Sequence, residues 1–140
     1  MTVKGHRAIV IPADPAVPCR AGWIPAGGNL ELLQRLVGGD IEVARYDPDA
    51  YFLVNETGAI EGLPVNERVT RYVHEHSNRA AQLRERGRRF PPDYLIHGDA
   101  VLVGTNGGMD ADVPQRFYDT FAVPIRRIEE LGPAGPAIEQ

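Results

Sequence analysis

The chain has 140 residues, of which 43% are hydrophobic, and it carries a formal net charge of −4. This length fits one domain with its own core, and the hydrophobic fraction excludes an intrinsically disordered chain. No apolar run approaches the roughly 18 residues of a membrane-spanning helix, and the first apolar run is too short for a signal peptide. We therefore expect a soluble cytoplasmic protein without a membrane segment.

The cysteine content and the net charge argue against several further classes of protein. Cys19 is the only cysteine, so the chain has no internal disulfide and no thiolate cage for a metal. The negative net charge argues against non-specific nucleic-acid binding, which depends on clustered positive charge. Acidic residues predominate between residues 31 and 61, whereas residues 79–89 hold five arginines and one glutamate.

The first predicted elements are a strand and a helix. Residues 7–12 are rich in β-branched side chains and end at a proline, which is typical of a strand. A loop rich in proline and glycine follows, to residue 28. Asn29 then caps a helix with leucines on one face, and Gly38 ends it because glycine adopts the left-handed conformation at low cost.

Two further strands are predicted next, over residues 41–46 and 51–54. They are joined by a turn at residues 47–49, where two aspartates flank a proline. Residues 55–58 supply turn-forming side chains, with Gly58 suited to a positive φ, and residues 59–63 can return as a hairpin arm. The region therefore predicts a compact antiparallel unit.

The longest predicted helix covers residues 67–86, with Asn66 as its cap and Gly87 as its stop. Its apolar side chains recur at intervals of three and four residues, as on one face of a helix: Val65, Val69, Tyr72, Val73, His76, Ala80 and Leu83. Residues 94–104 then predict a strand, residues 105–112 a glycine-rich loop, and Pro114 lies near the start of a short helix.

The sum of these elements predicts an α+β fold. We expect a single domain over residues 1–132, with a small mixed or antiparallel sheet and two main helices packed on one face. A short helical segment follows near the C-terminus, and residues 133–140 form a disordered tail.

The sequence offers little for covalent or metal chemistry. Ser77 is the only serine and neighbours His76, but adjacent residues on a helix do not face each other. His74 and His76 diverge by about 200° on a helix with 3.6 residues per turn, so they cannot share one ion. We assign no catalytic residue, no metal ligand and no cofactor.

Two local motifs have a structural and a functional interpretation. His97 and Asp99 would share one face of a strand, as an acid–base pair needs, but Gly98 between them favours a bend. The Gly104–Gly108 loop follows a strand and precedes a helix, as phosphate loops do. It lacks the lysine of the Walker pattern, and acidic residues follow it, which favours a plain turn.

An arginine cluster at the end of the long helix is the best candidate for an anion or nucleic-acid contact. Cations at a helix C-terminus also complement the helix dipole without any ligand, and this structural interpretation is favoured. The cluster consists of Arg79, Arg84, Arg86, Arg88 and Arg89.

A polar group lies around the turn and the start of the long helix. Turn formation and capping explain part of it. If the turn folds over the helix N-terminus, these groups converge on exposed N–H donors and form a preorganised polar pocket. The candidate binding residues are Asn55, Glu56, Gly58, Asn66 and Thr70.

Several of these segments together resemble a known family. The chain reads AIVIPAD, LQRLVGGDIEVA, FLVNETGAIEGLPVN and IHGDAVLVGT in that order, with a threonine at position 70. It resembles the domain of unknown function 3846, found in bacteria and their phages, which implies a small accessory protein with no known enzymatic activity. Residues 17–28 and 74–92 look longer than expected for that family, so any role of the arginine cluster belongs to this chain.

We therefore expect a non-enzymatic phage or mobile-element accessory protein that binds a host protein or a small polar molecule. By analogy alone, such a function is compatible with countering host defence. One alternative is a nucleic-acid-binding module built on the Arg79–Arg89 cluster. A second alternative is a small hydrolase or nucleotide-modifying enzyme that uses His97 and Asp99. We expect a monomer or a homodimer.

Overall fold

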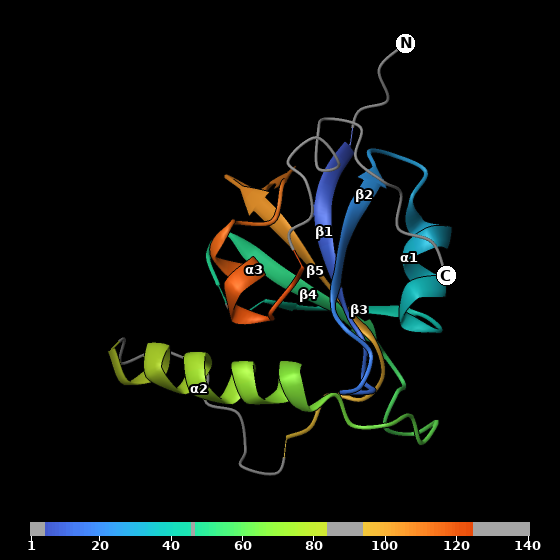
Figure 1. Ribbon diagram of the computed structural model, residues 1–140, viewed down its shortest axis with the longest axis vertical. Coiled ribbons are helices and arrows are strands. Elements are labelled where there is room, and N and C mark those ends of the chain that lie inside the picture. Colours follow the sequence, from blue (N-terminus) through green and yellow to red (C-terminus); the bar gives the residue numbers. More distant parts are fainter. Residues whose placement is uncertain (1–4, 46, 84–93, 125–140) are drawn as a thin grey trace.

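A computed structural model describes residues 5–45, 47–83 and 94–124. Within them, six strands form one antiparallel sheet in the order β2-β1-β5-β4-β3, and β6 pairs with the far end of β5. Figure 1 shows this sheet with its three helices. The strands are β1 (Gly5–Ile11), β2 (Arg20–Pro25), β3 (Ile41–Arg45), β4 (Ala50–Asn55), β5 (Ala100–Asn106) and β6 (Met109–Ala111). The helices are α1 (Leu30–Val37), α2 (Glu67–Leu83) and α3 (Arg116–Thr120).

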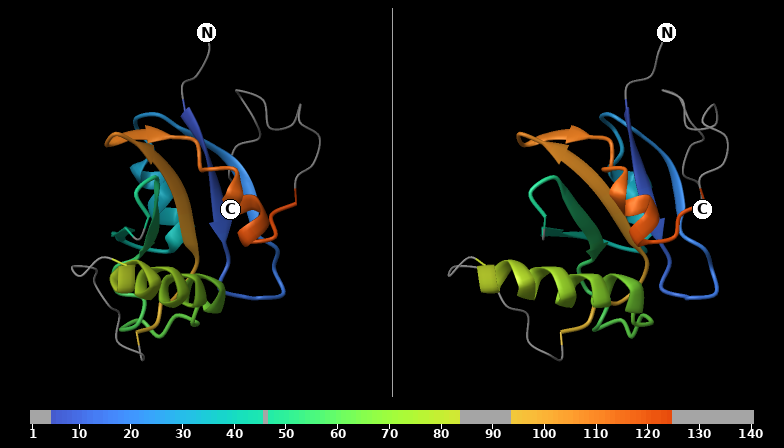
Figure 2. Two further views of the ribbon diagram at one scale, coloured as in Figure 1. Left: turned by 90° about the vertical axis from the view of Figure 1, so that its left-hand side faces the viewer. Right: turned by 60° about the vertical axis from the view of Figure 1, so that its left-hand side comes forward.

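The central strands are apolar on both faces, so the sheet has a core on each side. In β1, Ile9 and Ile11 point into one core, whereas Ala8 and Val10 point into the other. The larger core is closed by α2 and α3, and α2 runs across one end of the sheet (Figure 2). The smaller core is closed by α1, which packs on β3, β4 and β5.

The α+β class, the antiparallel sheet and the short helix near the C-terminus are confirmed. The structure differs in the placement of the two main helices, because α1 packs on the face opposite to α2. The physical reason is the continuous apolar sequence of β1 and β5. A strand that is apolar at every position needs a covering layer on both faces, and one helix supplies each.

Three segments differ from their predicted conformation. The loop before residue 28 contains β2, which pairs along the length of β1. Residues 59–63, predicted as a hairpin arm, form turns, and the positive φ expected at Gly58 occurs at Gly62 (φ 72°). The strand predicted over residues 94–104 begins only at Ala100, because Gly98 (φ 89°) bends the chain before it.

The end of α1 has the predicted geometry. Gly38 adopts the left-handed conformation with φ 81°, and the N–H groups of Gly38 and Gly39 both donate to the Gln34 carbonyl, at 2.8 and 3.0 Å. This satisfies a carbonyl that the last turn of a helix otherwise leaves unpaired. The turn delivers the chain directly into β3.

We find that no helix within the described ranges combines the length and the apolar character that crossing a membrane requires.

Candidate functional site

Asn66, one of the predicted binding residues, is completely buried. Its side-chain N–H groups donate to the Ile11 carbonyl at 2.8 Å and to the Gly98 carbonyl at 3.0 Å. Its side-chain oxygen accepts the N–H of Val69 at 3.2 Å, so Asn66 is also the predicted cap of α2. One side chain thus joins the end of β1, the bend at Gly98 and the first turn of α2.

Two further predicted residues lie close to the same bend. The Thr70 hydroxyl accepts the N–H of Ile96 at 3.0 Å, and Thr70 is buried. Gly58 lies directly against His97, where an added Cβ would come within 2.8 Å of the His97 carbonyl oxygen. The structure therefore brings Gly58, Asn66 and Thr70 together around residues 96–98.

The remaining two predicted residues lie at the end of α1. The buried Asn55 side chain donates to the Val37 carbonyl at 3.2 Å and accepts the Thr57 N–H at 2.8 Å. Glu56 donates its backbone N–H to the Asp40 carbonyl, and its side chain is exposed. The side-chain polar groups of Asn55, Asn66 and Thr70 are thus engaged by the main chain, and they hold the fold together.

His97 and Asp99 have separate partners. The ring nitrogen Nδ1 of His97 lies 2.8 Å from the Leu63 carbonyl, and the Asp99 carboxylate accepts the Ala13 N–H at 2.8 Å. The bend at Gly98 between them is the predicted one, with the Gly98 N–H donating to the Pro64 carbonyl at 2.7 Å. Each side chain contacts the main chain of a different loop, and the described contacts do not join them as an acid–base pair.

Contacts with neighbouring residues also explain the positions of His74, His76 and the glycine loop. His74 Nε2 lies 2.7 Å from the Tyr94 carbonyl, and His76 stacks on Tyr72 with ring centroids 3.9 Å apart. In the described part of the chain, no three His, Cys, Asp or Glu side chains gather as a metal site requires. Gly107 (φ 60°) and Gly108 (φ 83°) form the tight turn between β5 and β6, the plain turn favoured above.

The predicted arginine cluster falls largely outside the described residues. Arg79 belongs to α2, and residues 84–89 lie in a range that the structure does not describe.

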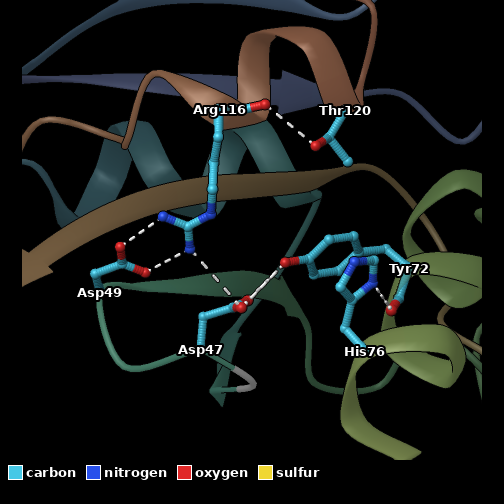
Figure 3. A network of polar contacts seen from close by, with 6 residues as sticks. All are labelled: Asp47, Asp49, Tyr72, His76, Arg116 and Thr120. Atoms are coloured by element: carbon cyan, nitrogen blue, oxygen red, sulfur yellow. Dashed lines mark hydrogen bonds and ion pairs between the residues drawn. The ribbon is translucent and has the colours of Figure 1, made fainter. Parts of the chain in front are cut away.

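A polar network that was not predicted links the turn before β4 to α2 and α3 (Figure 3). Arg116 donates two hydrogen bonds to the Asp49 carboxylate, at 2.6 and 2.7 Å, and lies 3.9 Å from Asp47. The Tyr72 hydroxyl lies 3.1 and 3.0 Å from the two oxygens of Asp47. The bidentate pair fixes the planes of both groups, so the network sets the position of α3 against the sheet.

The two aspartates of this network have opposite pKa shifts. Burial raises the pKa of Asp47, since its side chain is only 15% exposed. The hydrogen bonds from Arg116 lower the pKa of the more exposed Asp49. A carboxyl group whose pKa is higher in the folded state stabilises the fold at low pH, and this contribution is lost as the pH rises through the folded-state pKa. A carboxyl group whose pKa is lower in the folded state stabilises the fold at higher pH, and this contribution is lost as the pH falls.

We therefore predict opposite pH responses for two variants. Between about pH 6 and about pH 3, where carboxylates titrate, Asp47→Asn should lose more stability than the wild type. Asp49→Asn should lose less, because the contribution that acid removes is already absent. Urea unfolding at both pH values measures these differences. Identical pH dependence in the two variants would contradict the assigned shifts.

A groove of about 180 Å³ lies on the face of the sheet that α1 covers only in part. Its lining residues come from several strands and from α1, and most of them are apolar. The apolar lining includes Ile24, Leu33, Ile41, Val43, Tyr51, Leu53 and Val103, and the polar lining residues include His6, Asn29 and Asp110. Val43 is 56% exposed, which is unusual for a large apolar side chain in a strand.

Val43 also lies on the outermost strand of the sheet. The Glu56 N–H donates to the Asp40 carbonyl, and β3 continues this antiparallel ladder with β4. Because hydrogen-bonded pairs alternate, Glu42 and Ala44 bond to β4, and the backbone N–H and C=O of Val43 point outward. Within the described ranges, no strand pairs with this outer edge of β3.

The comparison with protein families matches residues 7–122 to DUF3846, a domain of unknown function. The chain belongs to the DUF3846 family. No curated protein matches it. The crystal structure of the small RNA methyltransferase HEN1 is similar, with a TM-score of 0.51 and 14% identity over 87% of this chain. The match covers 16% of the HEN1 chain, and at this identity it bears on the fold alone.

The DUF3846 region contains both features just described. It includes the whole of β3 with its open edge, and it includes Asp47, Asp49, Tyr72 and Arg116 of the polar network. The family match therefore covers both the fold and the exposed surface. Because the family has no assigned function, a functional proposal has to be argued from the residues of this surface.

Proposed function

We propose that this DUF3846 protein acts by binding, and that its partner is an extended segment of another protein that pairs with the edge of β3. The observation that supports this is the combination at Val43 of an exposed apolar side chain and an outward-facing backbone. In the bacterial or phage setting that the family resemblance implies, the partner is a host protein.

Backbone pairing supplies the affinity in this proposal. An outer strand offers a row of unpaired donors and acceptors, and a peptide that adds to it satisfies them. The opposite edge of the sheet, β2, is the weaker candidate, because none of its large apolar side chains is exposed. The edge of β3 instead continues into the apolar groove through Ile41 and Val43.

The charge around β3 specifies the chemistry of the partner. Glu42 is exposed on the face opposite to Val43, and Asp40 and Glu56 lie at the start of the strand. Side chains of an added strand alternate between the two faces, so every second residue lies beside Val43 and the others lie beside Glu42. The matching segment therefore alternates apolar and basic residues.

Selection from a displayed library of random ten-residue peptides tests this proposal. We expect the selected peptides to alternate apolar and basic residues, and to protect the Val43 amide from hydrogen exchange. Val43→Pro should weaken binding at least about tenfold, because proline removes the outward donor without removing a ladder hydrogen bond.

Ile60→Asp is the matched control, since Ile60 is 88% exposed but lies in the turn region outside the sheet. It should bind the selected peptides as the wild type does. Peptides that bind Val43→Pro and the wild type equally would overturn the proposal, as would a selection without this alternation. Circular dichroism of each variant confirms that the fold is retained.

A further inference from the structure

A second hollow, of about 250 Å³, lies between α2 and the end of α3. It is separate from β3 and its groove, because the two sets of lining residues share no member. It is lined by Arg68, Arg71, Tyr72, Glu75, His76, Thr120, Phe121 and Ala122.

The charged groups of this pocket are predominantly positive. Its lining includes two arginines and one acidic residue, Glu75, although the whole chain has a net charge of −4. Arg71 is exposed, and its side chain forms no hydrogen bond or ion pair with the other described residues. An exposed cation at the mouth of a pocket attracts an anion without first breaking an ion pair.

Arg68 contributes a second cationic group that is fixed in place. Its Nη2 lies 2.6, 3.0 and 2.8 Å from the carbonyls of Pro12, Asp14 and Val17, which anchor it to the loop before β2. Its Nε is buried and has no partner in the described structure. Carbonyls orient a guanidinium without neutralising its charge, so Arg68 adds a positive charge to the lining of the pocket.

The remaining walls of the pocket are aromatic or apolar. The Tyr72 and Phe121 rings lie with centroids 5.5 Å apart, and the His76 ring stacks on Tyr72. The Tyr72 hydroxyl bonds to Asp47 and the Thr120 hydroxyl donates to the Arg116 carbonyl (Figure 3). Their hydrogens are therefore committed elsewhere, and the arginines supply the donors.

We propose that this pocket binds a small organic anion that carries a flat aromatic ring. Arg71 and Arg68 hold its phosphate or carboxylate group, and the ring packs against His76, Phe121 and Ala122. Guanidinium groups match both kinds of anion, and aromatic side chains favour a flat ring over an aliphatic body. The inference does not depend on the proposed pairing at β3.

Titration of the whole chain with phenyl phosphate, followed by NMR of the backbone amides, tests this site. We expect saturable shifts centred on the lining residues, and weaker binding of inorganic phosphate, which lacks the ring. Arg71→Gln should weaken binding at least about tenfold through loss of a charge-assisted contact. Glu75→Gln should strengthen it about two- to fivefold, because a repelling carboxylate is removed.

Benzoate in a parallel titration distinguishes a carboxylate site from a phosphate site. Arg20→Gln is the matched control, since Arg20 is exposed on β2 and lies outside the pocket; it should bind as the wild type does. Val43→Pro should also bind phenyl phosphate normally, which separates this site from the edge of β3. Shifts that avoid the pocket, or equal affinities of Arg71→Gln and the wild type, would overturn the proposal.

Discussion

Replacing Asn66 by alanine is expected to destabilise the protein by at least about 3 kcal/mol. The substitution removes three hydrogen bonds and leaves the Ile11 and Gly98 carbonyls and the Val69 N–H without their partner. Asn66 is fully buried, and each unpaired polar group in such a place costs about 1–3 kcal/mol. The substitution also removes a connection between elements that are far apart in sequence, because Asn66 lies 55 residues from Ile11.

Urea unfolding followed by circular dichroism measures this loss. Asn29→Ala is the matched control, since Asn29 is only half-buried and its side chain makes a single hydrogen bond to the residues that the structure describes, to the Pro25 carbonyl at 2.9 Å. That variant should lose no more than about 1.5 kcal/mol, the net value of a single hydrogen bond. A comparable loss in the two variants would show that Asn66 is not the central connection described here.

The local elements could be predicted because their signals lie within a few neighbouring residues. Gly38 marks the end of α1, Asn66 the start of α2, and Gly98 a bend, and each has the predicted role. These are properties of one residue and its own backbone, such as a positive φ or a side chain that bonds three residues ahead. They need no knowledge of the rest of the fold.

The placement of α1 depends on information that is not local. Its apolar face shows that it is buried but not against which side of the sheet. The deciding residues are in β1, where Ala8 and Val10 alternate with Ile9 and Ile11. A run that is apolar at every position indicates a strand covered on both faces, which assigns one helix to each.

The candidate site illustrates the same limit. The sequence predicts a turn at Asp47 and Asp49, but their partner Arg116 lies 67 residues from Asp49. The polar residues predicted as a pocket were found at the expected turn and helix start, where long-range main-chain partners occupy their side chains. Sequence spacing shows that polar groups exist, whereas the fold decides which of them remain free to bind a ligand.

Replacing Val73 by aspartate is expected to abolish folding. Val73 lies in α2 with no exposed surface and packs in the larger core, which also contains Phe52, Phe117 and Leu102. An unpaired carboxylate in such a place costs several kcal/mol even after its pKa rises. That cost is comparable with the roughly 5–15 kcal/mol that stabilises a typical domain. Circular dichroism and size-exclusion chromatography should show an unfolded or aggregated chain.

Two further variants separate the effect of burial from that of the helix itself. Arg71→Asp places the same side chain two residues earlier on the exposed face of α2, so it should cost less than about 1 kcal/mol. Val73→Thr keeps the shape of valine but buries a hydroxyl, and should fold with a loss of about 1–3 kcal/mol. If this face of α2 closes the core, the loss of stability should increase in the order Arg71→Asp, Val73→Thr, Val73→Asp. A folded Val73→Asp protein would place Val73 at the surface and contradict the packing of α2 on the sheet.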